Sequence, residues 1–258
     1  MQPTPFDDVN ATLGSLLSEM RAVLAEKLVG LYLYGSLTTG GFVTGSSDID
    51  LLAAVSSDVD SREFDDLQRM HADFANNRPE WDDHIEVQYL PLLALQTFKT
   101  QPRTVPVISP GEPFHWREVD RDWTMNWYDV QQNGVTLAGP DPRTLIDPIL
   151  QAEFVQTVRD QVEPWTERVG HTPRRRGAYA YVILTMCRTL YSCETGQQVS
   201  KQQAARWAQG AIPEWAPLIA RALEWHLDAP RRSQPVGEAA PQETSAFVQF
   251  VAGRVVGK

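Results

Sequence analysis

Cysteine is scarce in this sequence, which has only Cys187 and Cys193 in 258 residues. Their spacing matches neither the CxxC pattern of a metal site nor a disulfide framework, so we expect buried, reduced thiols. Also missing is any run of the roughly 20 apolar residues that would span a bilayer. The first ten residues, MQPTPFDDVN, lack the basic region and apolar run of a secretory signal. We therefore expect a cytoplasmic protein with no membrane partner.

Positive charge is also in short supply. Lys and Arg number 23 against 33 Asp and Glu, which gives a formal net charge of -10. Nucleic-acid backbones are bound by clustered Lys and Arg, so this balance argues against a nucleic-acid partner. It favours a cationic small-molecule partner, although the charge also suits solubility alone. With 42% hydrophobic and 22% charged residues, the chain has the composition of a folded globular protein, which we expect to be a monomer or weak dimer.

The first part of the chain reads as alternating helices and strands. Apolar residues at helical spacing predict helices, and short aliphatic or alternating runs predict strands. The expected order is helix 7–28, strand 31–34, strand 49–55, helix 62–75 and strand 84–90. Prolines interrupt residues 92–122, and we expect an irregular loop region there, over the site. Residues 123–132 then read as a helix, and GVTLAGPDP (134–142) as a turn with a short strand.

From residue 151 onward the pattern is helical. We expect a domain boundary near Leu150, which gives a catalytic domain over 1–150 and a helical domain over 151–258. The predicted helices share 3.6-residue periodicity and cover 153–169, 177–194, 200–209, 215–227 and 245–256. Residues 229–243 read as a polar link before the last helix. Helices of this number and length predict an all-α bundle.

One stretch carries the chemistry: LYGSLTTGGFVTGSSDIDLLAAV, residues 33–55. Asp48 and Asp50 lie two residues apart at the start of a strand, so both project from one face, about 7 Å apart. Mg²⁺ is commonly held by one or two carboxylates together with substrate phosphates. Gly35 allows the backbone to approach a phosphate, while Ser36 and Ser47 can donate hydrogen bonds to it. The alternative is that Asp48 caps a turn and Asp50 is a solvated strand residue.

This order of Gly-Ser, a spacer and Asp-x-Asp resembles the polymerase-beta nucleotidyltransferase superfamily, matched here by Gly35, Ser36, Asp48 and Asp50. The resemblance implies an α/β (α+β) catalytic domain with a mixed sheet, two Mg²⁺ ions and a third carboxylate on a nearby strand. Glu86 in HIEVQYL is the candidate, because its neighbours Ile85 and Val87 point the other way. It would complete the metal site or take the proton of the acceptor hydroxyl; the alternative is a solvent-facing strand residue.

The second half is similar to one branch, the streptomycin and spectinomycin adenylyltransferases, in GVTLAGPDPRTLIDPI and VILTMCRTLYSCETGQQVSKQQAARWA. That resemblance implies transfer of AMP from ATP to an aminoglycoside, and so antibiotic resistance. It also implies that Arg188 and Lys201 reach the nucleotide phosphates. Alternatively, Arg188 is a helix residue whose charge is paired within the helical domain, and Lys201 is exposed to solvent. Ser200 and Gln203 resemble a capping box, so Lys201 is expected to open a helix.

The chain departs from this branch where the acceptor is expected. Members of this branch that modify streptomycin usually present acidic residues just before the helix that carries the arginine, but this chain has Arg174, Arg175 and Arg176, with Ala178 in place of an acid. That favours spectinomycin over streptomycin, unless the arginines are only a solvated helix start. Trp116 is a candidate acceptor contact and His226 a candidate near the nucleotide; both residue types also pack routinely in cores.

The sequence thus predicts an ATP- and Mg²⁺-dependent adenylyltransferase with Asp48, Asp50 and Glu86 as its catalytic carboxylates. Two other hypotheses remain. In one, the same chemistry acts on a protein, an RNA end or another small molecule. In the other, the chain is a non-catalytic nucleotide sensor, against which the three carboxylates argue.

Overall fold

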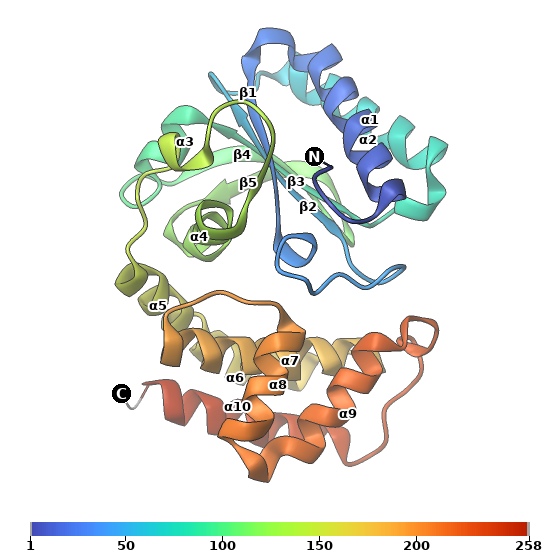
Figure 1. The fold of residues 1–258 in the computed structure, drawn as a ribbon, viewed down its shortest axis with the longest axis vertical. Helices are drawn as coiled ribbons and strands as arrows, with labels where there is room; N and C mark the ends of the chain where they lie inside the picture. Colours follow the sequence, from blue (N-terminus) through green and yellow to red (C-terminus); the bar gives the residue numbers. More distant parts are fainter. Residues whose placement is uncertain (1, 257–258) are drawn as a thin grey trace. The chain divides into compact units, whose positions relative to one another are not determined.

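A computed structural model describes residues 2–256 (Figure 1). The chain divides into two compact units, each described here by itself. The first holds the segment up to Phe42 together with Ser47–Ile149, and the second holds Val43–Ser46 together with the chain from Leu150 onward. None of the helices in the described range is both long and apolar enough to cross a membrane.

The first unit is built on a mixed six-stranded sheet with the order β5-β4-β3-β2-β1-β6. Its strands are β1 (Leu28–Tyr34), β2 (Ile49–Val55), β3 (Ile85–Pro91), β4 (Arg103–Ser109), β5 (Glu112–Val119) and β6 (Val135–Ala138). Only the β2–β3 pair is parallel, and the other neighbours are antiparallel. The helices of this unit are α1 (Asp7–Leu24), α2 (Ser61–Asn77), α3 (Leu92–Thr97) and α4 (Thr124–Asn133).

The two faces of the central strands are covered by different helices. Alternate residues of β1, β2 and β3 point to one face, where they form the main core with α1 and α2. Leu33, Leu51 and Val87 belong to this core and are fully buried. On the opposite face, α4 packs its buried Trp127 against Phe98, with ring centroids 4.5 Å apart. Figure 1 shows α1 and α2 on one side of the sheet and α4 on the other.

The expectation of an irregular loop region over residues 92–122 is wrong, because this stretch holds α3 and the β4–β5 hairpin. The prolines fit the hairpin for positional reasons. Pro113 lies in the edge strand β5, and Pro106 lies outside the short part of β4 that pairs with β3, so its missing N–H leaves no gap in that ladder. Gly111, with a φ of 80°, makes the turn.

The second unit is a helical bundle. Its helices are α5 (Gln151–Asp160), α6 (Val162–Arg168), α7 (Arg176–Thr195), α8 (Lys201–Ala211), α9 (Ala216–Leu227) and α10 (Ala240–Val256). The fully buried Ile183 and Met186 of α7, Ala205 of α8 and Val251 of α10 share one core. Cys187 is buried there and Cys193 is half-buried, both as free thiols.

Two predicted helices in this unit differ from expectation. The predicted helix 153–169 is two helices, α5 and α6, and Pro164 sits in the first turn of the second, where its missing N–H does no harm. The last helix starts at Ala240, inside the expected link, with Pro241 in its first turn. As expected, Lys201 opens a helix, and the Ser200 side chain accepts a hydrogen bond from the Gln203 N–H at 3.2 Å.

Candidate active site

Three polar side chains stand side by side on the α4 face of the sheet. In the register of the strands, Asp50 of β2 lies between Tyr34 of β1 and Glu86 of β3. Neighbouring strands are about 4.8 Å apart, and residues paired in this way point to the same face. Two of the predicted carboxylates, Asp50 and Glu86, are therefore direct neighbours at the edge of a buried surface.

Asp48, the third predicted carboxylate, precedes β2 and is half-exposed. Its Oδ1 lies 2.9 Å from His84 Nδ1, at the start of the chain leading into β3. The negative charge of Asp48 contributes to raising the pKa of Glu86, so the two carboxylates influence each other directly. The structure thus brings Asp48, Asp50 and Glu86 to one end of the β2–β3 pair.

The Gly35–Ser36 turn closes against Asp50. Gly35 has a φ of 77°, and a Cβ added there would lie 2.1 Å from Asp50 Oδ2, so only glycine fits. The Gly35 N–H donates to Asp129 Oδ2 of α4 at 3.1 Å, and the Gly35 carbonyl accepts from Thr39 Oγ1 at 2.8 Å. The Ser36 Oγ is buried without a hydrogen-bond partner among the described residues. A buried hydroxyl of this kind is a group that a ligand can satisfy.

Glu86 is held by a hydrogen-bonded set of side chains. Its Oε1 accepts from the Tyr34 hydroxyl at 3.2 Å and from Gln88 Nε2 at 3.3 Å. Burial raises the pKa of Glu86, while the Gln88 and Tyr34 hydrogen bonds and the charge of Arg117 oppose the rise. Burial, together with the charges of Glu86 and Asp50, also raises the pKa of Tyr34 well above its usual value. Tyr34 is therefore a hydrogen-bond donor at neutral pH.

The donor set fits Mg²⁺ in its chemistry. No three Asp, Glu, His or Cys side chains of residues 2–256 are gathered into a group that could hold an ion on its own. Mg²⁺ needs fewer protein ligands than that, because substrate phosphates and water complete its shell. Asp48 and Asp50 offer hard oxygen ligands beside the Gly35–Ser36 turn.

The predicted nucleotide contacts of the second unit lie on α7, α8 and α9. The half-buried guanidinium of Arg188 has no hydrogen bond or ion pair with any residue that the structure describes. The Lys201 Nζ lies 3.9 Å from the centre of the Tyr181 ring. Burial, followed by the charges of Lys201 and Arg232, lowers the pKa of His226 to about 4. The cation Lys201 and the imidazole of His226, which is neutral at pH 7, are therefore close enough to interact.

Trp116 is not brought to the carboxylates. Its ring stacks on Phe64 of α2 with centroids 4.8 Å apart, and Phe64 packs against the main core. Trp116 is thus on the α1–α2 face of the sheet, opposite Asp50 and Glu86. Ser47, the other predicted contact, is half-exposed and immediately precedes Asp48.

Sequence reasoning missed the supporting residues Tyr34, Gln88, Asn126, Trp127 and Asp129. Gln88 carried a signal, since it is a polar residue two positions after Glu86 in a buried strand and so shares its face. Tyr34, directly before the Gly-Ser pair, carried a weaker one. The contributions of α4 have no local signal, because they depend on which face of the sheet the helix covers.

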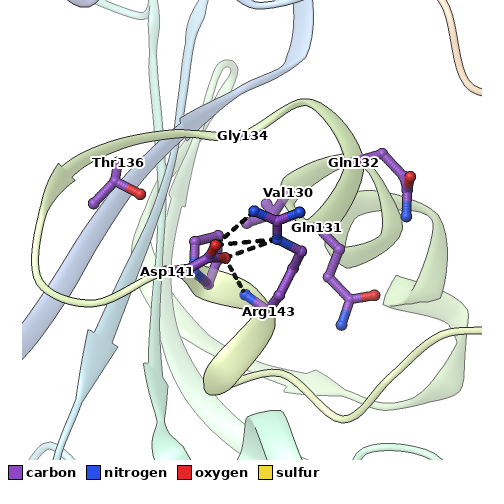
Figure 2. A pocket seen from close by; sticks show the side chains of 8 residues that line it. Val130, Gln131, Gln132, Gly134, Thr136, Asp141 and Arg143 are labelled. Atoms are coloured by element: carbon purple, nitrogen blue, oxygen red, sulfur yellow. Dashed lines mark hydrogen bonds and ion pairs between the residues drawn. The ribbon is translucent and has the colours of Figure 1, made fainter.

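A polar pocket of about 140 Å³ lies beside β6 and the end of α4. Figure 2 shows Asp141 and Arg143 facing each other in it, with Gln131, Gln132 and Thr136 around them. The Arg143 Nη2 donates to Asp141 Oδ2 at 2.6 Å. None of the predicted site residues lines this pocket, and its charged groups satisfy each other.

The chain is similar to known adenylyltransferases. Residues 144–253 match the family model of the aminoglycoside adenylyltransferase C-terminal domain. An aminoglycoside (3'') (9) adenylyltransferase of Shigella flexneri is 26% identical, covering 100% of both chains. The chain is an adenylyltransferase-type nucleotidyltransferase. A spectinomycin 9-adenylyltransferase of Campylobacter jejuni is 22% identical over 93% of this chain and 92% of its own. The family resemblance predicted from the sequence is thereby confirmed.

The fold has a counterpart among solved structures. A spectinomycin adenyltransferase of Enterococcus faecialis, crystallised with ATP and spectinomycin, superposes with a TM-score of 0.73 at 17% identity. The match covers 95% of this chain and 98% of the other. The predicted fold class, a mixed-sheet nucleotidyltransferase domain followed by a helical bundle, is confirmed.

Proposed function

We propose that this adenylyltransferase moves AMP from ATP to a hydroxyl group of an aminoglycoside or aminocyclitol and releases pyrophosphate. The observation that carries the proposal is the register of Asp50 and Glu86 beside the Gly35–Ser36 turn. A candidate metal-binding carboxylate, a candidate base and the proposed phosphate-binding turn are thereby neighbours. The named activities of the relatives support the same reaction, and such a reaction would inactivate the antibiotic and confer resistance.

The nucleotide contacts predicted from the sequence keep their roles in this proposal. Gly35 would let the backbone approach the triphosphate, and Ser36 and Ser47 would donate hydrogen bonds to it; the buried, unpartnered Ser36 Oγ supports this role. Asp48 and Asp50 would hold Mg²⁺, with Glu86 adjoining them. When bound, Mg²⁺ would neutralise the charge that builds up on the phosphates. Arg188, whose guanidinium has no partner among residues 2–256, and Lys201 would supply further cations.

Glu86 acts as the base in this proposal. Its carboxylate takes the proton of the acceptor hydroxyl while that oxygen bonds to the α-phosphorus and the bond to the β-phosphate oxygen breaks. The AMP group stays on the acceptor, and pyrophosphate leaves. A burial-raised pKa suits the role, because a base is most effective when its pKa approaches the working pH.

For the acceptor, we favour spectinomycin over streptomycin. The net charge of -10 attracts cationic molecules in general. Arg174 and Arg175, however, are exposed, and Arg176 is half-buried, at the start of α7. These charges would repel a strongly cationic drug more than a small aminocyclitol. The same observation favours a second candidate, an acceptor that is not an antibiotic, such as a protein or another small molecule.

The test is pyrophosphate release from ATP and Mg²⁺, measured with spectinomycin, streptomycin and other aminoglycosides one at a time. We expect turnover with spectinomycin, its loss in Glu86→Gln, and no effect of Glu118→Gln, the same change at an exposed position of β5. Tight ATP binding without turnover on any drug would overturn the antibiotic assignment. The search would then move to other acceptors or to a sensor.

A further inference from the structure

A chain of buried hydrogen bonds runs from helix α4 to the proposed base. The Trp127 Nε1–H donates to Gln88 Oε1 at 3.2 Å, and Gln88 Nε2 donates to the Tyr34 hydroxyl at 2.9 Å. The Tyr34 hydroxyl in turn lies 3.2 Å from Glu86 Oε1. Gln88 and Trp127 are fully buried and Tyr34 is 4% exposed. Their burial limits the access of solvent to these bonds, so each group depends on the next for its hydrogen bond.

The direction of every bond in this chain follows from the donor inventory. An indole N–H is only a donor, so it must face the Gln88 oxygen, and the Gln88 amide nitrogen must then face Tyr34 and Glu86. Asn126 Nδ2 also donates to the Tyr34 hydroxyl, at 3.4 Å. With donors occupying the Tyr34 oxygen, its single hydrogen is left for Glu86 Oε1.

We propose that Trp127, Gln88 and Tyr34 form a positioning relay that anchors Glu86 through Oε1 and leaves Oε2 to take the acceptor proton. The proposal rests on the proposed function of Glu86 as base. Glu86 Oε2 makes no hydrogen bond with the residues that the structure describes, whereas Oε1 accepts two. None of the three relay residues touches the reacting atoms in this scheme. Their effect is to fix the carboxylate in one orientation, which is what proximity catalysis requires.

The same strand provides a matched control on its other face. Tyr89 is fully buried, and its hydroxyl lies 2.8 Å from His71 Nε2. Tyr89→Phe therefore removes a buried, hydrogen-bonded hydroxyl, as Tyr34→Phe does, but on the α2 side. A general loss of packing or stability would affect both variants alike. A loss of Glu86 orientation would affect only Tyr34→Phe.

The kinetic test compares Tyr34→Phe, Gln88→Met and their double variant in pyrophosphate release. A hydrogen bond to a charged group corresponds to about tenfold in rate or more, so each single change should lower kcat about tenfold, with both KM values nearly unchanged. In a relay the double variant should be little worse than either single one. Losses that multiply to about a hundredfold, or an equal loss in Tyr89→Phe, would overturn the proposal.

A second readout needs no turnover. In nucleotide-free protein, the Trp127 indole N–H signal in a ¹H–¹⁵N spectrum can be assigned by its loss in Trp127→Phe. We expect it to move in Gln88→Met, Tyr34→Phe and Glu86→Gln, and to stay in Tyr89→Phe. If it stays in the first three while Glu86→Gln is inactive, the relay is wrong and the proposed function stands. If Glu86→Gln retains turnover, Glu86 is not the base, and the relay has no role in positioning one.

Discussion

The two faces of strands β1–β3 have different roles: one forms the hydrophobic core, and the other carries the candidate site, although their residues are adjacent in sequence. Leu33, Leu51 and Val87 build the core against α1 and α2. Their neighbours Tyr34, Asp50 and Glu86 form a polar row on the face of α4. Because side chains alternate along a strand, each core residue is followed or preceded by a residue that points to the site face.

The comparison also shows what a buried polar face requires. Acidic groups on a covered surface are unfavourable unless they are hydrogen-bonded. Helix α4 meets this need with polar side chains: Asn126 and Trp127 reach the Tyr34–Gln88 pair, and Asp129 holds the Gly35 N–H. The α1–α2 face needs no such support except where His71 and Tyr89 pair with each other.

The largest effect is expected from adjacent substitutions on opposite faces. Asp50→Asn should lower kcat roughly 10³-fold, since the stabilisation that a metal ligand supports amounts to several kcal/mol, with little change in unfolding free energy. Leu51→Ala should do the reverse, costing about 2–5 kcal/mol of stability while folded molecules keep their kcat. Denaturant unfolding and pyrophosphate release measure the two. An Asp50→Asn variant that turns over normally would end the assignment.

Two glycines of the same loop sharpen this comparison. Gly35 and Gly40 have φ values of 77° and 69°, so alanine strains the backbone at both, by about 1 kcal/mol. Only at Gly35 would the new Cβ collide with Asp50; at Gly40 no described atom outside the adjacent residues of the chain lies within 4 Å of it. We expect kcat to fall by about ten- to a hundredfold in Gly35→Ala and little in Gly40→Ala. Equal activity losses in the two variants would show that backbone strain, and not the contact with Asp50, matters.

The strength of the local pattern decided what could be predicted from the sequence. The strand Ile49–Val55 was predicted to the residue, because a continuous aliphatic run lies between clear turn signals. The β4–β5 hairpin was missed because prolines mark loops in sequence, whereas an edge strand and the part of β4 that does not pair with β3 accept them. The carboxylates were found through their spacing. The α4 supports and the true face of Trp116 depend on tertiary packing, which no local spacing encodes.

On the apolar face, the buried His71 makes the stability of the folded protein sensitive to acid. Burial lowers its pKa to about 3, against 6.5 for an ordinary histidine. Between those values the unfolded chain binds a proton that the folded chain does not, so stability is full above pH 6.5 and falls as the pH is lowered towards 3. The slope is about 1.4 kcal/mol per pH unit.

We therefore expect the His71→Gln variant to lose less stability than the parent between pH 7.5 and 5.5. Denaturant unfolding at the two pH values measures the difference. His171→Gln, at an exposed histidine, should keep the parent slope. An unchanged slope in His71→Gln would mean that His71 is protonated in the folded protein.

The smallest effect is expected at Trp116, where sequence and structure point to different roles. The sequence suggests an acceptor contact, but the ring stacks on Phe64 on the α2 side of the sheet. Trp116→Ala should lower the unfolding free energy by about 1 kcal/mol, the scale of an aromatic pair, and leave kcat and the acceptor KM within about twofold. Trp123→Ala is the comparison variant. The Trp123 ring centre lies 5.3 Å from the guanidinium carbon of Arg117, and the charge of Arg117 acts on Glu86. A rise of the acceptor KM in Trp116→Ala but not in Trp123→Ala would mean that the acceptor contacts the edge strand β5. The separation of core residues on one face from site residues on the other would then hold only for β1–β3.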